Sequence, residues 1–373
     1  MSIILCALIL VASVSPVSGA VPLAEPDISL MNEVDHSLEL GIDWLREQQL
    51  PDGSWNSYPA ITALAVAAIA NDPRGDSDEN QQAVERGVDY ILGCVKPSGG
   101  IFGEDMEVYN TSIALMALVL VDADKHRDVI EKARGRLTEL QYEGGEGATP
   151  ESADFGGFGY DVDRRPDLSN TQWALEALWM AEKLEMEAAP GEPERLEKAR
   201  TALHWEHAIK FLERCQNLRA TNDQQWASND GGFVYRPGES KAGDTLSYGG
   251  MTYAGLKSFI YAKVSRTDPR VQAAFNWIRK SYTVNENPGL GREGLYYYYH
   301  TMAKALDAYG AEVIVDAEGV GHKWRDDLLA KLVSLQNGDG YWVNENARWW
   351  ENDKVLVTSY TLLAMEIVSS AYR

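Results

Sequence analysis

Two kinds of apolar segment alternate along the chain from about residue 34 to residue 369. The first kind carries apolar side chains at helical spacing with charges between them, as Leu38, Ile42 and Leu45 show. Charges between the apolar positions indicate a helix with one face in solvent. Six segments share this pattern, at residues 34–48, 81–95, 127–141, 202–216, 270–282 and 324–336.

The second kind of segment is apolar on nearly every side and rich in alanine, which is typical of a buried helix. Six of these follow the amphipathic segments in turn, at residues 60–70, 111–121, 170–183, 250–264, 299–309 and 358–369. The alternation recurs every roughly 50 to 60 residues, a period that suggests a repeat architecture. We therefore expect an all-α chain folded as an (α/α)6 barrel, or toroid, of six helical hairpins. No strand pattern of useful length is visible.

A glycine-rich turn joins the two helices of a hairpin. Residues 49–55 read Gln-Leu-Pro-Asp-Gly-Ser-Trp and residues 336–342 read Gln-Asn-Gly-Asp-Gly-Tyr-Trp, with shorter Gly-Gly versions at 99–102, 156–158 and 231–233. Glycine permits the left-handed backbone with which helices end, and the aromatic ring can pack on the neighbouring hairpin. We interpret these motifs as structural rather than catalytic.

Composition adds expectations about location and partners. The 373 residues include 34 Lys and Arg against 56 Asp and Glu, and a net charge of −22 argues against nucleic acid as a partner. Residues 2–14 are almost wholly apolar, and the small residues Ser18, Gly19 and Ala20 follow. This pattern is typical of a signal peptide over residues 1–20, although no Lys or Arg precedes it; a buried N-terminal helix is the alternative. We expect one toroid domain over residues 21–373, exported to the periplasm or secreted, without a membrane span.

The Gln–Asp-Gly-x-Trp turns between alternating helices resemble the repeats of the squalene-cyclase and protein-prenyltransferase superfamily. The resemblance covers about residues 33–370 and implies a terpenoid-cyclase-like toroid that holds isoprenoid chains in an aromatic-lined central cavity. It is specific for fold and much less so for activity. Two chemistries occur in the superfamily, and each requires its own residues.

Polyprene cyclisation requires an Asp-x-Asp-Asp-Thr motif at the start of an inner helix, whose middle Asp protonates an alkene. The corresponding residues here are Asp167, Leu168, Ser169, Asn170 and Thr171. Asp167 and Thr171 match the motif, but Ser169 occupies the position of the acid and cannot protonate an alkene. The resemblance therefore does not extend to the squalene-cyclase acid.

Zinc-assisted prenylation requires an Asp-x-Cys pair and a His as metal ligands. Tyr299, His300 and Thr301 match the family's Tyr-His-Thr motif, but Leu246 and Tyr248 stand where the Asp and Cys should be. Neither replaces an anionic zinc ligand. We expect no metal at this site, and no cofactor motif is visible in the chain.

All inner helices should point their N-termini toward one end of the barrel, where their first turns would surround a shared cavity. His300 is the first catalytic candidate because it titrates near neutrality, and Asp167 or Asp244 could orient it. Asp167 is the second candidate. The alternatives are a buried, hydrogen-bonded His300 and an Asp167 that only caps its helix. The expected ligand-binding residues are Tyr109, Asn110, Ser169, Asn170, Gln172, Tyr248, Tyr253, Tyr298 and Tyr360.

Three functions remain open. The first is an exported terpenoid-cyclase-like toroid that binds a small apolar or isoprenoid ligand, with the cyclase acid and zinc ligands missing. The second is a non-catalytic ring that binds a protein partner. The third is a carbohydrate-active (α/α)6 enzyme, which would need two carboxyl groups across the cleft, and Asp167 and Asp244 are the pair that the sequence offers. We favour the first.

Overall fold

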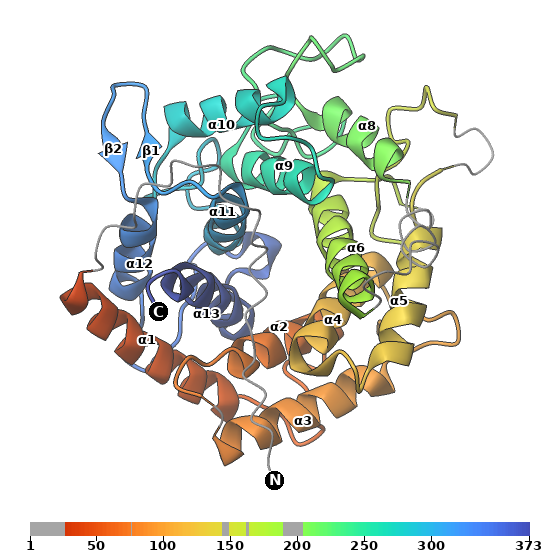
Figure 1. The fold of residues 1–373 in the computed structure, drawn as a ribbon. Helices are drawn as coiled ribbons and strands as arrows, with labels where there is room; N and C mark the ends of the chain where they lie inside the picture. The colour runs from red at the N-terminus through yellow and green to blue at the C-terminus, as the bar shows by residue number, and fades with distance from the viewer. Residues whose placement is uncertain (1–26, 76, 144–148, 162–163, 189–203) are drawn as a thin grey trace.

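Two concentric rings of helices form the molecule (Figure 1). The computed structural model describes residues 27–373 except 76, 144–148, 162–163 and 189–203, so the predicted signal peptide lies outside the described residues. The outer ring consists of α1 (Ile28–Glu47), α3 (Asp78–Gly93), α5 (Arg127–Glu139), α8 (Trp205–Cys215), α10 (Pro269–Ser281) and α12 (Trp324–Ser334). The inner ring consists of α2 (Pro59–Ala70), α4 (Glu107–Asp122), α6 (Leu168–Ala188), α9 (Gly249–Tyr261), α11 (Leu295–Tyr309) and α13 (Lys354–Ser370).

Each inner helix packs against the inner helices before and after it, and α13 packs against α2 to close the ring. The prediction of an all-α (α/α)6 barrel is confirmed. The described residues also contain a small antiparallel pair that the sequence pattern did not indicate, β1 (Ile314–Val315) with β2 (Gly321–His322), and a short 3-10 helix η1 (Arg348–Trp350). No helix among the described residues is long and apolar enough to cross a membrane.

The inner helices α4, α11 and α13 begin about one turn before the apolar runs that predicted them. Their first turns carry polar and aromatic side chains, which an apolar pattern does not detect. Asp353 caps α13 through a 2.9 Å hydrogen bond from the Leu356 backbone amide to its carboxylate. The added turns matter because they reach the end of the ring where the cavity lies.

The glycine-rich turns repeat one set of contacts around the ring. A threonine of the inner helix accepts the backbone N–H of the turn's apolar residue in five hairpins, as Thr62 does from Trp55 and Thr358 does from Trp342, each at 3.0 Å. Gly340 has φ +98°, and a Cβ there would lie 2.5 Å from the carbonyl oxygen of Leu40 in α1. The last turn therefore closes against the first outer helix, and only glycine allows that approach.

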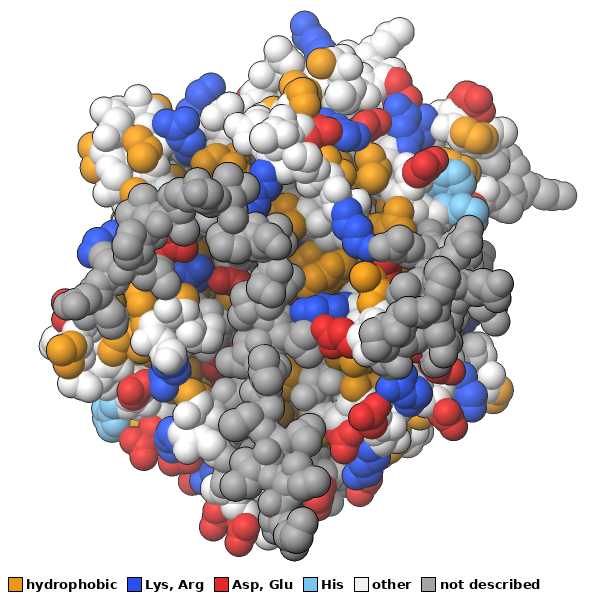
Figure 2. All heavy atoms as spheres, in the orientation of Figure 1, with side chains coloured by type: hydrophobic (Ala, Val, Ile, Leu, Met, Phe, Trp, Pro, Cys, Tyr) orange, Lys and Arg blue, Asp and Glu red, His pale blue; other side chains and the backbone are white. Residues whose placement is uncertain are grey.

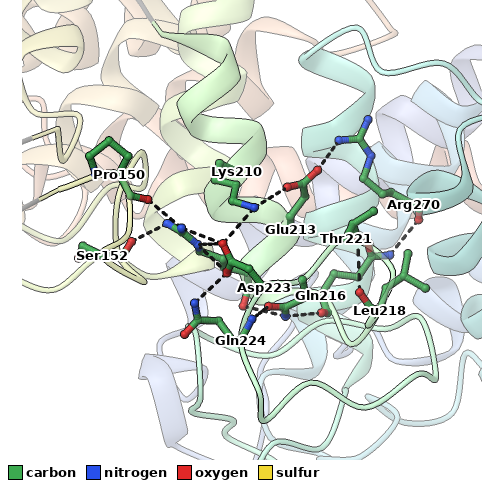
Figure 3. Close-up of polar contacts among 12 residues, drawn as sticks. Pro150, Ser152, Lys210, Glu213, Gln216, Leu218, Thr221, Asp223, Gln224 and Arg270 are labelled. Atoms are coloured by element: carbon green, nitrogen blue, oxygen red, sulfur yellow. Dashed lines mark hydrogen bonds and ion pairs between the residues drawn. The ribbon is translucent and has the colours of Figure 1, made fainter.

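In four of the turns, the glutamine near the end of the outer helix ties two hairpins together. Gln216 at the end of α8 donates from Nε2 to the carbonyl oxygen of Gly231 at 3.0 Å. It also donates to the carbonyl oxygen of Arg270 at 2.8 Å (Figure 3). Gln49, Gln141 and Gln336 each make the same two bonds, one to the turn of the same hairpin and one to the next hairpin around the ring. The glutamine amide thus bridges the glycine-rich turn of one hairpin and the outer helix of the next.

Charged side chains occupy the outer helices and loops (Figure 2). Beside the Gln216 turn, the Arg214 guanidinium makes a bidentate ion pair with Asp223, with N–O distances of 3.0 and 2.9 Å (Figure 3). It also donates to the backbone carbonyl oxygens of Pro150 and Ser152. The bonds from Arg214 to Asp223 lower the pKa of the Asp223 carboxyl. The contacts of Arg214 hold a loop of the third hairpin against the fourth.

Candidate functional site

The N-terminal ends of all six inner helices surround a cavity of about 340 Å³. Its wall is mainly apolar and rich in aromatic rings, with seven tyrosines and two tryptophans among the twenty lining residues that the structure describes. The lining residues include Tyr58, Tyr109, Tyr160, Ser169, Tyr235, Tyr248, Asn287, Tyr297, Trp349, Trp350, Glu351 and Tyr360. A concave, mainly apolar site with a few polar groups is the usual form of a small-molecule site.

Most polar groups in this wall already have partners within the protein. The Tyr109 and Tyr360 hydroxyls lie 3.2 Å apart. Asn287 accepts from the Gly250 amide at 3.0 Å and donates to the Glu293 carbonyl at 2.9 Å. The cavity consequently offers apolar surface and aromatic faces rather than free hydrogen-bonding groups.

Glu351 is the one carboxylate among the described residues that lines the cavity. It is only 1% exposed and accepts hydrogen bonds from the Tyr297 backbone amide at 2.8 Å and from Asn344 Nδ2 at 2.7 Å. Burial raises the pKa of the Glu351 carboxyl, and the backbone and Asn344 donors act in the opposite direction. Because one carboxylate oxygen accepts from the first turn of α11, Glu351 also holds the start of that helix in place.

A tryptophan pair covers one side of the cavity. Trp349 and Trp350 of η1 have φ of 55° and 64°, a left-handed backbone that is uncommon for bulky residues. Their side chains are 42% and 53% exposed, and the Trp350 ring meets Tyr58 edge to face at 5.6 Å. The Trp349 ring lies so close to Gly294 that a Cβ there would come within 2.9 Å of it. A strained backbone therefore presents two large aromatic rings both to the cavity and to solvent.

His300 lies beneath the cavity and does not line it. Its ring is stacked between Trp173, with centroids 5.4 Å apart, and Tyr360, with centroids 5.2 Å apart. Its Nε2 has no hydrogen-bond partner among the described residues. Desolvation, followed by the nearby Lys304 and Lys257, lowers the pKa of His300 well below its usual value, so the imidazole is neutral.

A buried ion cluster lies one turn below His300, and sequence analysis did not identify it. Glu176 of α6 accepts from Lys257 Nζ of α9 at 2.5 Å and from Lys304 Nζ of α11 at 2.8 Å. Both ammonium groups also lie 5.3 Å from the Trp173 ring centroid. Desolvation of Glu176 is outweighed by the two lysines, which lower the pKa of its carboxyl to about 2. The cluster joins three inner helices through charges that the sequence shows only as isolated polar positions in apolar runs.

Asp167 caps α6. Its Oδ1 accepts from the Asn170 backbone amide and its Oδ2 from Asn170 Nδ2, both at 2.9 Å. It is fully buried, and desolvation raises the pKa of its carboxyl to about 6 against these hydrogen bonds. Asp244 is exposed in a loop, and neither Asp167 nor Asp244 lines the cavity.

Four of the predicted ligand-binding residues line the cavity: Tyr109, Ser169, Tyr248 and Tyr360. The other five do not. Asn110 accepts from the Ala60 amide, Asn170 bonds to Asp167, and Tyr298 donates to the Thr283 carbonyl. Tyr253 packs edge to face on Tyr298 at 5.5 Å, and Gln172 is buried with no partner among the described residues for either end of its amide.

Several lining residues were missed because they lie outside the inner helices. Tyr160 and Tyr235 come from the turns before α6 and α9, where each follows a glycine-rich motif within a few residues. Trp349, Trp350 and Glu351 come from the loop between α12 and α13. The Trp-Trp pair outside any repeat motif was the available signal for that loop.

Comparisons with known proteins agree with this architecture. Residues 58–210 match the family model of the squalene-hopene cyclase C-terminal domain. Lanosterol synthase ERG7 of Saccharomyces cerevisiae is 27% identical over 135 residues, which cover 31% of this chain and 18% of the synthase. The chain thus aligns with less than a fifth of that relative's length.

Solved structures of two kinds share the fold. The type II terpene cyclase MstE from Scytonema has a TM-score of 0.54 at 13% identity, covering 92% of this chain and 100% of the cyclase. Another MstE structure, with its substrate geranylgeranyl dihydroxybenzoate, has a TM-score of 0.51 at 11% identity, covering 92% and 98%. The α-1,6-mannanase GH76A of Salegentibacter sp. HEL1_6, with α-1,6-mannotriose, has a TM-score of 0.57 at 10% identity, covering 91% and 99%.

At these identities the structures establish the fold alone. The family match and the toroid together support a place for this chain in the terpenoid-cyclase-like superfamily.

Proposed function

We propose that this protein is an exported binding protein for a short isoprenoid or a similar apolar molecule, held in the central cavity without being protonated. The observation that carries the proposal is the position of Ser169. It lines the cavity at the start of α6, where the resemblance requires a carboxylic acid. Its hydroxyl lies 3.5 Å from that of Tyr297, within a wall that is mainly apolar and rich in aromatic rings.

The lining supports an apolar ligand. Transfer of apolar surface from water is favourable, while each polar group of a ligand would need a partner that this wall does not have free. The volume of about 340 Å³ is near the lower end of the roughly 300–1,000 Å³ range of small-molecule sites. A sesquiterpene alcohol such as farnesol therefore suits the cavity better than a triterpene.

The surrounding groups do not supply the acid that cyclisation needs. An acid for an alkene must be a neutral carboxyl aimed at the ligand. Asp167 is committed to the α6 cap, and His300 is neutral and separated from the cavity by the stacked Tyr360 ring. Burial raises the pKa of the Glu351 carboxyl, but its Oε1 accepts from the Tyr297 backbone amide and its Oε2 from Asn344 Nδ2, so both oxygens are engaged by the protein. Binding without turnover is what this arrangement supports.

A glycosidase is less well supported, although a mannanase shares the fold. Glycoside hydrolysis uses two carboxyl groups that face each other across the cleft, and the described residues place Glu351 alone in the cavity wall. We therefore treat recognition of a sugar as an outcome that the following experiment would reveal.

The test is calorimetric titration of the purified mature chain with farnesol and, separately, with α-1,6-mannotriose. We expect saturable one-to-one binding of farnesol and none of the sugar. Ser169→Phe should fill the cavity and weaken binding at least tenfold. Ser334→Phe adds the same ring on the exposed end of α12 and should leave binding unchanged. Absence of farnesol binding, or equal binding by both variants, would overturn the proposal.

Export is tested separately by cell fractionation and N-terminal sequencing. We expect the mature chain to begin near residue 21 and to accumulate outside the cytoplasm. A cytoplasmic chain that retains residues 1–20 would refute this part of the proposal and leave ligand binding standing.

A further inference from the structure

A compact group of metal-binding side chains lies on the outer ring, apart from the residues that line the cavity. Glu143 follows α5, and His204 and His207 stand at the start of α8. One ligand atom from each lies within 4.8 Å of the other two. His204 Nε2 is 3.4 Å from Glu143 Oε2, and His207 Nδ1 is 2.8 Å from Glu143 Oε1. Histidine side chains reach the surface beside α8 in Figure 2.

The spacing matches what a small divalent cation requires. Zinc binds His nitrogen and carboxylate oxygen at about 2.0–2.2 Å, so two ligand atoms on a tetrahedral ion lie about 3.3 Å apart. The two measured separations, 2.8 and 3.4 Å, lie on either side of that value. The three ligand atoms lie within 4.8 Å of one another, so side-chain movement of about 1.5 Å or less would place all three on one ion. Three protein ligands of the His-His-Glu type leave one position for water.

The fold holds both histidines in position. The repeat glutamine Gln141 donates from Nε2 to the His204 carbonyl oxygen and accepts from the His204 backbone amide, both at 3.2 Å. Gly156 approaches the His207 carbonyl so closely that no side chain fits between them. The His207 ring lies between Phe155, at 4.5 Å, and His204, at 4.8 Å, between centroids. The cluster therefore loses little conformational entropy when it binds a ligand.

The charge environment also suits coordination. A neutral imidazole nitrogen binds a metal ion through its lone pair. Glu143 supplies negative charge to a bound cation and is only about one-third exposed on its side chain. Imidazole ligands favour zinc and other transition metals over magnesium and calcium.

We infer that Glu143, His204 and His207 form a zinc site that clips the third hairpin to the fourth. The site joins the end of α5 to the start of α8, and Glu143 and His207 are 64 residues apart along the chain, so metal binding should stabilise the ring. It lies away from the cavity and takes no part in the proposed ligand binding. The inference does not depend on the proposed function.

The test uses Zn²⁺ alone on the full mature chain freed of metal with EDTA. Calorimetry should show one equivalent of Zn²⁺ bound with micromolar or tighter Kd, together with a rise in Tm, while Mg²⁺ at the same concentration has no effect. His207→Gln and Glu143→Gln should each weaken Zn²⁺ binding at least tenfold and remove most of the rise in Tm.

His36→Gln is the matched control. His36 on α1 is an exposed histidine 3.5 Å from Glu39, and no third ligand joins this pair among the described residues. That variant should bind Zn²⁺ like the unaltered chain. Circular dichroism and the Tm of the metal-free chain show whether each variant is folded. No Zn²⁺ binding by the unaltered chain, or equal binding by the His207→Gln variant, would overturn the inference.

Discussion

Replacement of Asp167 by asparagine should change how stability depends on pH. Asp167 is fully buried and its pKa is raised from 3.8 to about 6, with desolvation as the main cause. The folded chain therefore holds a proton at pH values where the unfolded chain has lost it. A raised carboxyl pKa stabilises the fold below the unfolded pKa, and this contribution is lost as pH rises through the folded pKa. Asparagine does not titrate and removes the effect.

The magnitude follows from the shift. The two pKa values differ by about two units, and each unit corresponds to about 1.4 kcal/mol, which gives about 3 kcal/mol between pH 4 and pH 8. The cap itself can survive the substitution. The introduced amide oxygen would still accept from the Asn170 backbone amide, and Asn170 Oδ1, which has no partner among the described residues, could accept from the introduced amide nitrogen after a flip of the Asn170 side chain.

The assay is urea unfolding of both chains from pH 4 to pH 8. Other groups titrate equally in the two chains and cancel in the difference. We expect the unaltered chain to lose about 3 kcal/mol relative to Asp167→Asn over this range. Asp353→Asn in α13 makes the same change at a cap that is only half-buried, and it reports the effect of exchanging a capping carboxylate for an amide. Parallel stability profiles for Asp167→Asn and the unaltered chain would refute the reasoning.

Three further predictions follow from the same structure. Combined Ser169→Asp and Asn170→Asp restores the cyclase motif, with position 169 in the cavity wall, and we expect gas chromatography to detect cyclised farnesol with the double variant and with neither single one. Urea unfolding should show that Gly340→Ala lowers the free energy of unfolding more than Gly243→Ala does. Both glycines have φ near +95°, but a Cβ on Gly340 would collide with the Leu40 backbone, while a Cβ on Gly243 would have no atom within 4 Å. Glu176→Gln leaves two buried lysines without their carboxylate and should cost about 3–5 kcal/mol of unfolding free energy; a loss below about 1 kcal/mol would contradict the assigned ion cluster.

The ring was predictable from sequence because the helix and turn patterns that form it are local in the chain and recur in each hairpin. Apolar periodicity separates outer from inner helices, and the turn motifs show where each hairpin reverses. Tyr109 and Tyr360 could be placed at the cavity for the same reason, since the first turns of inner helices point to a common end. Side chains in regular positions relative to a repeat are therefore accessible to sequence reasoning.

The rest of the site depends on contacts between distant segments. The loop of Trp349, Trp350 and Glu351 has no periodicity, and its left-handed backbone is not signalled by glycine. Whether Glu176 meets a lysine depends on how far α9 and α11 are shifted along their axes relative to α6. The location of His300 beneath the cavity rather than in its wall also depends on that relative position, since one helical turn separates it from the lining residue Tyr297.

The most direct test of the central claim combines binding and chemistry in one measurement. The purified mature chain is incubated with excess farnesol, separated from free ligand, and the bound molecule is extracted and identified by mass spectrometry. A ligand held against Ser169 without an acid should be recovered in about one equivalent with all its double bonds intact. Recovery of a cyclised product, or of no bound farnesol, would contradict the account.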